Sequence, residues 1–124
     1  MKNTLVFGAS PNPGRYSYIA IERLVEAGLP TLAFGLKTGK VKGVSIQNTL
    51  GEMEEVHTLT LYMRPSRQVP FYEAIMELKP KRVIFNPGTE NPEFYILLKA
   101  ADIEVVVACT LAMLSVGTYL SDPL

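Results

Sequence analysis

Short, almost continuous runs of apolar residues alternate along the chain with longer segments in which apolar and charged positions follow a helical period. The runs are rich in valine, isoleucine and leucine, which is typical of strands covered on both faces of a parallel sheet. These runs predict five strands, at Thr4–Gly8, Leu29–Gly35, Val56–Met63, Arg82–Asn86 and Ile103–Cys109.

The segments between the runs predict helices. In Tyr16–Ala27, Ile21 and Leu24 lie on one side, the charged residues lie on the other, and Gly28 ends the helix. Further helices are predicted at Pro65–Leu78, with Val69 facing inward, at Pro92–Ala101 and at Leu111–Val116. The less regular segment Lys37–Glu55 is expected to hold a loop and a short helix near Leu50–Met53.

This alternation of strands and helices predicts an α/β fold built from βαβ units. We expect a Rossmann-like three-layer sandwich with a parallel sheet of about five strands. Because the chain has no repeat or linker, residues 1–124 are expected to form a single domain. In such sheets ligands bind at the carboxyl ends of the strands, near the point where the strand order reverses.

The composition of the chain argues against several classes of protein function. The 124 residues include 12 Lys plus Arg and 12 Asp plus Glu, so the net charge is zero. This balance gives no electrostatic case for a nucleic-acid or membrane partner. The single cysteine excludes a disulfide within the chain. With no signal-like start and no apolar stretch of spanning length, we expect a cytoplasmic protein.

The strongest candidate site is the turn after the first predicted strand. Its glycines and prolines allow a sharp turn, and the free N–H groups of the following helix favour a phosphate. Two serine hydroxyls and an arginine add further donors. The alternative is an ordinary strand-to-helix turn with a serine cap. The candidate ligand-binding residues here are Gly8, Ala9, Ser10, Pro11, Asn12, Arg15, Tyr16 and Ser17.

The turn matches neither of the best-known phosphate motifs. A P-loop requires Lys followed by Ser or Thr after its last glycine, and here Arg15 and Tyr16 follow Gly14. The dinucleotide pattern requires a second glycine where this chain has Ser10. An NAD site also favours an acid after the second strand, whereas this chain has Lys37. A cation there suits an extra phosphate, and a solvated loop lysine is the alternative.

Two later strand ends reach the same edge of the predicted sheet. Arg64 and Pro65 follow the third strand, and Gly88 lies in a second glycine turn after the fourth. We include these three residues among the candidate ligand-binding residues. The alternative for Arg64, as for Arg67, is a solvent-exposed arginine at a helix start.

Catalytic and metal-binding patterns are weak. His57 is the only histidine and is placed near the start of a strand, which is the wrong end for this fold. Cys109 therefore has no histidine to activate it and is expected to be a small buried residue. Glu90 is the one carboxylate expected near the cleft. We predict no catalytic residues and no metal site.

Several segments together resemble the stand-alone CoA-binding domain family, which is similar to the amino-terminal domain of the succinyl-CoA synthetase α subunit. The opening VFGASPNPGRYS carries the family's first turn, and Lys37 matches its lysine after the second strand. RPSRQVP, NPGTENPEF and VVVACTLAML match its later segments in order. One departure is Gly35-Leu36, where the family usually has Asn-Pro.

The resemblance implies coenzyme A as the ligand, whose 3′-phosphate suits a lysine at position 37. We therefore expect a small protein that binds CoA or acyl-CoA and is not itself catalytic. One alternative is an NAD(P)-dependent oxidoreductase. Another is an interaction module with a vestigial nucleotide site. The sequence leaves the acyl group and the oligomeric state open.

Overall fold

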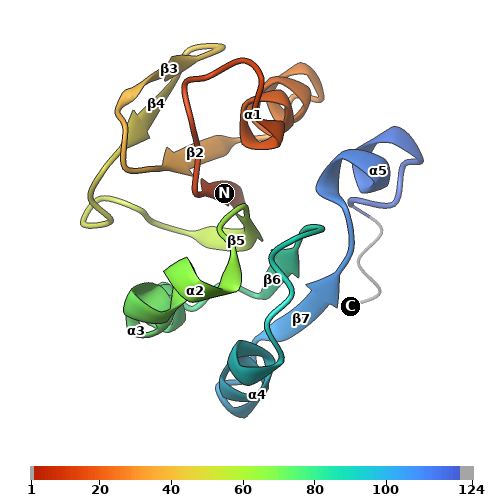
Figure 1. Ribbon diagram of the computed structural model, residues 1–124. Coiled ribbons are helices and arrows are strands. Elements are labelled where there is room, and N and C mark those ends of the chain that lie inside the picture. The colour runs from red at the N-terminus through yellow and green to blue at the C-terminus, as the bar shows by residue number, and fades with distance from the viewer. Residues whose placement is uncertain (1, 121–124) are drawn as a thin grey trace.

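The computed structural model describes residues 2–120 and contains one seven-stranded sheet in the order β3-β4-β2-β1-β5-β6-β7 (Figure 1). The five predicted strands are all present and run parallel to their neighbours in this set. The α/β, Rossmann-like class is therefore confirmed, although the sheet is larger than five strands. The strands are β1 (Asn3–Phe7), β2 (Thr31–Phe34), β3 (Gly39–Val41), β4 (Val44–Gln47), β5 (Val56–Leu61), β6 (Arg82–Phe85) and β7 (Glu104–Val107).

The two additional strands form a hairpin where we expected a loop and a short helix. β3 is antiparallel to β4, which pairs parallel with β2. The turn between them consists of Lys42 and Gly43, both with positive φ (50° and 82°), and this backbone suits the twist of a two-residue hairpin. The helix predicted near Leu50–Met53 is wrong. This segment is a turn closed by a hydrogen bond from Met53 N to Leu50 O.

The helix predicted at 65–78 is broken into three pieces. Pro70 has no N–H to donate and interrupts a regular helix at this point. Val69 is 53% exposed, so its predicted inward orientation is wrong. The helical elements are α1 (Tyr16–Glu26), α2 (Pro65–Gln68), the 3-10 turn η1 (Val69–Phe71), α3 (Tyr72–Glu77), α4 (Pro92–Ala100) and α5 (Thr110–Ser115).

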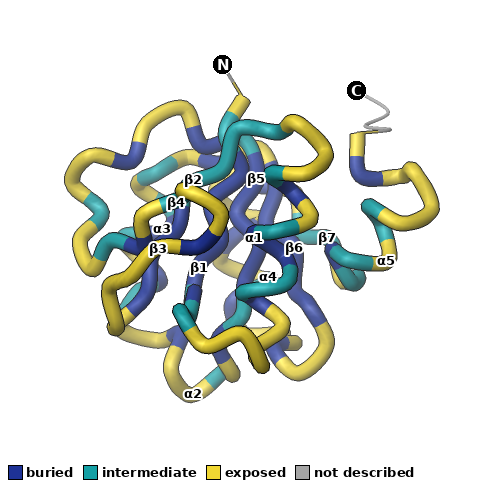
Figure 2. Tube along the Cα trace, turned by 90° about the horizontal axis from the view of Figure 1, so that it is seen from above, coloured by how far each residue is buried: buried dark blue, intermediate teal, exposed yellow. Residues whose placement is uncertain are grey.

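Helices cover both faces of the sheet and create two cores. α1 and α5 contact one another on one face, while α2, α3 and α4 lie on the other (Figure 1). Alternate residues of β1 enter different cores: Leu5 and Phe7 pack toward α3 and α4, and Val6 packs toward α1. The central strands β1, β5 and β6 therefore run as mostly buried segments through the middle of the molecule (Figure 2). This is the expected three-layer sandwich.

The strand order reverses at β1. From β1 the chain passes to β2 on one side and later to β5 on the other side. Loops at the carboxyl ends of β1 and β5 therefore diverge to opposite faces and leave a crevice between them. The topology directs attention to the residues that follow these two strands.

Candidate functional site

A groove of about 790 Å³ lies at this switch point, and its walls come from the loops that follow β1, β2, β5 and β6. The structure brings all of the predicted binding residues to this groove except Pro65, which does not line it. Six residues that were not among the predicted binding residues also line the groove: Leu36, Tyr62, Met63, Arg67, Pro87 and Thr89.

The turn after β1 lies very close to the neighbouring strands. Gly8 has φ of +94°, and a Cβ at this position would lie 3.0 Å from Met63 Cγ. The N–H groups of Gly8 and Ala9 both donate to Phe34 O at 2.8 Å. A Cβ on Gly35 would overlap the carbonyl oxygen of Ala9. Because glycine has no Cβ, positions 8 and 35 allow the turn after β1 to pack closely against the neighbouring strands and to form a wall of the groove.

The side chains of Ser10 and Asn12 hold the loop itself in shape. Ser10 Oγ accepts a hydrogen bond from Asn12 N at 3.1 Å, and Asn12 Oδ1 accepts one from Gly14 N at 2.9 Å. Arg15 N donates to Asn12 O at 3.1 Å. These bonds position the start of α1 above the groove.

The amino terminus of α1 has no side-chain cap. Arg15 occupies the cap position without capping the helix, and the N–H groups of Tyr16 and Ser17 make no hydrogen bond within residues 2–120. The serine cap considered from the sequence is therefore not formed. By contrast, Asn91 caps α4 by accepting from Phe94 N. Free N–H groups and the helix dipole at the start of α1 favour an anion in the groove.

Two residues of the groove lining carry buried hydroxyls. Within residues 2–120, Ser17 Oγ has no hydrogen-bond partner, and the Tyr62 hydroxyl lies near those of Thr60 and Thr110 without a well-formed hydrogen bond. Burial is the largest cause that raises the pKa of Tyr62, which reaches about 12, while the nearby hydroxyls of Thr60 and Thr110 lower it. Tyr62 therefore stays protonated at neutral pH and has a proton to donate.

The groove is lined by cations and by no acid. Arg15, Lys37, Arg64 and Arg67 all contribute to its walls, and no aspartate or glutamate among residues 2–120 does. Since the chain as a whole has no net charge, this cluster makes the groove locally positive. The electrostatics match a ligand that carries several phosphates.

Buried amides behind the groove hold the strand ends in place. Asn86 Nδ2 donates to Thr60 Oγ1 (2.8 Å) and to Leu61 O (2.9 Å), and Asn86 Oδ1 accepts from Thr110 N (2.8 Å). Gln68 Nε2 donates to Met63 O and Thr89 O, which joins the loops after β5 and β6. Neither Asn86 nor Gln68 was predicted to have a role. Each is visible in the sequence only as an uncharged polar residue next to an apolar segment.

The weak catalytic candidates are not assembled at the groove. His57 lies near the start of β5, at the opposite edge of the sheet, as its position in the sequence predicted. Glu90 accepts a hydrogen bond from Gly88 N at 2.9 Å and does not line the groove. Cys109 does not line it either and is half-buried rather than fully buried.

Residues 2–120 contain neither a candidate metal site nor a helix fit to span a membrane. No group of three or more histidine, cysteine, aspartate or glutamate residues lies close enough together to hold a metal ion there. None of the helices in this range has the length and apolar character needed to cross a lipid bilayer.

Comparisons with known proteins agree with this fold. A crystal structure of an uncharacterized protein is 50% identical, with a TM-score of 0.92, and the match covers 96% of this chain and 98% of that one. A Thermus thermophilus structure is 26% identical (TM-score 0.84; 95% and 90% covered). A hypothetical protein from Pyrococcus horikoshii shares the fold at 23% identity (TM-score 0.79; 88% and 78% covered).

No functionally curated protein matches the chain. The model of the CoA binding domain matches residues 2–115, which is nearly the whole sequence. The residues after β1 thus lie in the part of the chain that this model describes. The chain belongs to the CoA-binding domain family.

Proposed function

We propose that this protein binds CoA or an acyl-CoA in the groove at the carboxyl edge of the sheet, and that it does so without catalysing a reaction. The observation that carries this proposal is a groove lined by four cations at the uncapped start of α1. A phosphorylated ligand would supply the acceptors that this helix start lacks. The family to which the chain belongs supports CoA as that ligand.

The residues present fit the parts of CoA. The pyrophosphate would lie at the uncapped start of α1, where the N–H groups of Tyr16 and Ser17 are free. Lys37, at the end of β2, would meet the 3′-phosphate. The groove volume of about 790 Å³ lies within the range of small-molecule sites.

The first experiment compares ligands by thermal unfolding. At a concentration of CoA about one hundred times its Kd, binding should stabilise the protein by about 2.7 kcal/mol. NAD should stabilise it less, because the groove wall after β2 offers Leu36 and Lys37 and no acid for the ribose hydroxyls.

Equal shifts with NAD and CoA would favour a dinucleotide-dependent oxidoreductase. No shift with CoA, acetyl-CoA, NAD, NADP or ATP would favour an interaction module with a vestigial site. Release of free thiol from acetyl-CoA by the purified protein would contradict the non-catalytic role.

Lys37→Ala tests how the ligand is oriented. We expect this change to weaken CoA binding by about 1 to 3 kcal/mol through loss of a charge-assisted hydrogen bond. Binding of dephospho-CoA, measured by calorimetry, should weaken less because it has no 3′-phosphate. Lys40→Ala is the matched control, since Lys40 is exposed and lies outside the groove lining. Equal losses for both ligands would remove the assignment of Lys37 to the 3′-phosphate.

A further inference from the structure

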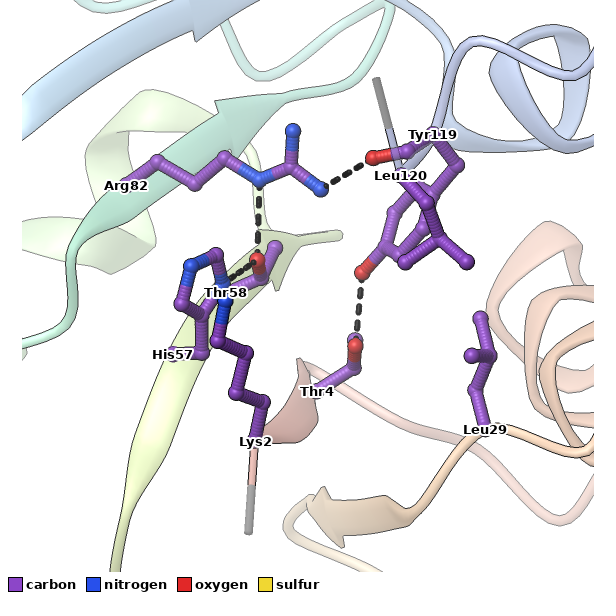
Figure 3. A pocket seen from close by; sticks show the side chains of 8 residues that line it. All are labelled: Lys2, Thr4, Leu29, His57, Thr58, Arg82, Tyr119 and Leu120. Carbon is purple, nitrogen blue, oxygen red and sulfur yellow. Dashed lines mark hydrogen bonds between the residues drawn. The ribbon is translucent and has the colours of Figure 1, made fainter. Parts of the chain in front are cut away.

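A second, smaller pocket lies at the amino edge of the sheet, opposite the groove (Figure 3). Its volume is about 60 Å³. Thr4, Thr58 and Arg82 contribute to it from the amino-terminal halves of β1, β5 and β6, whose carboxyl ends border the groove. Tyr119 covers one side of the pocket. The proposed CoA site does not use any of these residues.

Arg82 is the unusual residue of this pocket, because it is charged and only 6% exposed. Its Nε donates to Thr58 Oγ1 at 2.8 Å, and its Nη2 donates to Tyr119 O at 2.8 Å. Its Cζ lies 4.6 Å from the centroid of the Tyr119 ring. These contacts use two of the five N–H donors of a guanidinium that stays charged at every physiological pH.

Within residues 2–120, no carboxylate pairs with Arg82. Glu104 is its neighbour in the β6–β7 register, but Glu104 is exposed and makes no ion pair with it. The ion pair found in this part of the chain joins Lys42 and Glu26 instead. Burial of a charge without a counter-charge is costly, and residues 2–120 supply none for Arg82, so a bound anion would stabilise it.

The other pocket residues suit an anion. Lys2 and His57 also line the pocket, and no acidic residue in the described range does. Thr58 Oγ1, which accepts from Arg82, is 2.9 Å from His57 Nδ1, and Thr4 Oγ1 is 2.6 Å from Tyr119 Oη. These paired hydroxyls hold the walls in place around the guanidinium (Figure 3).

We propose that this pocket is a binding site for a small oxyanion, held by the guanidinium of Arg82. A single water needs about 10–15 Å³ of such volume. The 60 Å³ present therefore admits a carboxylate or an inorganic phosphate and excludes a nucleotide. Recognition comes from the planar fork of Arg82, which matches the geometry of both groups.

The test is an NMR titration of the full chain with sodium formate, acetate or phosphate, each in a chloride-free buffer of constant ionic strength. The Nε–Hε resonance of Arg82 should shift and saturate with at least one of these anions, and a preference among them separates carboxylate from phosphate. Arg23 on the surface of α1 is the internal control. Its side-chain resonance should show only a small, non-saturating response.

Two variants support this titration. Arg82→Lys keeps the charge without the fork and should weaken binding by about tenfold. If Arg82→Lys does not fold, Lys2→Ala, which removes an exposed cation of the same pocket, should weaken binding by a smaller factor. Lys81→Ala removes an exposed lysine outside the lining and should leave binding unchanged.

Saturating CoA should not alter the Arg82 response, so failure of either binding site can be recognised separately. The proposal is overturned if the Arg82 resonance responds like that of Arg23, or if saturable shifts are confined to groove residues. It is also overturned if binding occurs only after Asp122→Asn. That residue lies outside the described range, and this result would mean that the chain supplies its own counter-charge.

Discussion

Replacing Gly35 with alanine should lower the free energy of unfolding by about 3 kcal/mol or more and abolish CoA binding. The added Cβ would overlap the carbonyl oxygen of Ala9 and would also lie 3.2 Å from Ile46 Cγ2. Because the Ala9 carbonyl belongs to the turn after β1, relief of this overlap must move the groove wall. Denaturant unfolding and CoA calorimetry measure the two effects.

Gly51→Ala is the matched control for this change. A Cβ on Gly51 has no neighbour within 4 Å, and the residue is exposed. Its stability and CoA affinity should stay close to those of the parent protein. If Gly35→Ala folds with parental stability and binds CoA as before, the close approach of Ala9 to Gly35 does not shape the site.

Replacing Asn86 with alanine should destabilise the protein by about 3 kcal/mol, because buried groups of β5 and α5 lose their hydrogen bonds to this side chain. Asn86 is 2% exposed, and its amide bonds to Thr60, Leu61 and Thr110. The loss of these bonds should loosen the carboxyl ends of β5 and β6 and the start of α5. Thermal unfolding should show a midpoint lower by about 10 °C for a chain of this length.

The same substitution at Asn48 provides the comparison. Asn48 is exposed and makes no hydrogen bond within residues 2–120, so Asn48→Ala should change stability by no more than about 0.5 kcal/mol. A similar small effect at Asn86 would mean that its buried hydrogen bonds contribute little to holding the strand ends together.

The apolar runs were sufficient to predict the parallel part of the sheet, because strands covered on both faces tolerate few polar residues. The hairpin of β3 and β4 was missed for a physical reason. Lys40, Lys42 and Ser45 alternate with apolar residues over a very short stretch, and the turn contains Lys-Gly rather than the more usual Asn-Gly. The break at Pro70 was missed because the apolar period continued across it.

The part of the groove formed by the turn after β1 was predicted, because its lining residues are contiguous in the sequence. Tyr62 was missed because its role depends on burial of its hydroxyl near a distant element, the start of α5 at Thr110. Gln68 was missed because its partners, Met63 O and Thr89 O, are backbone atoms of two separate loops. Such contacts have no period or motif in a single sequence, and only the folded chain reveals them.

At position 15, the uncapped start of α1, a residue that favours stability of the free protein differs from one that favours binding of an anion. A serine or aspartate there would cap the helix and stabilise the empty protein by about 1 kcal/mol. The same cap would occupy the N–H groups that face the groove, and it would replace a cation of the lining. If Arg15 contributes to CoA binding as proposed, selection for thermal stability alone would weaken the site, and the arginine exchanges some resistance to heat for affinity.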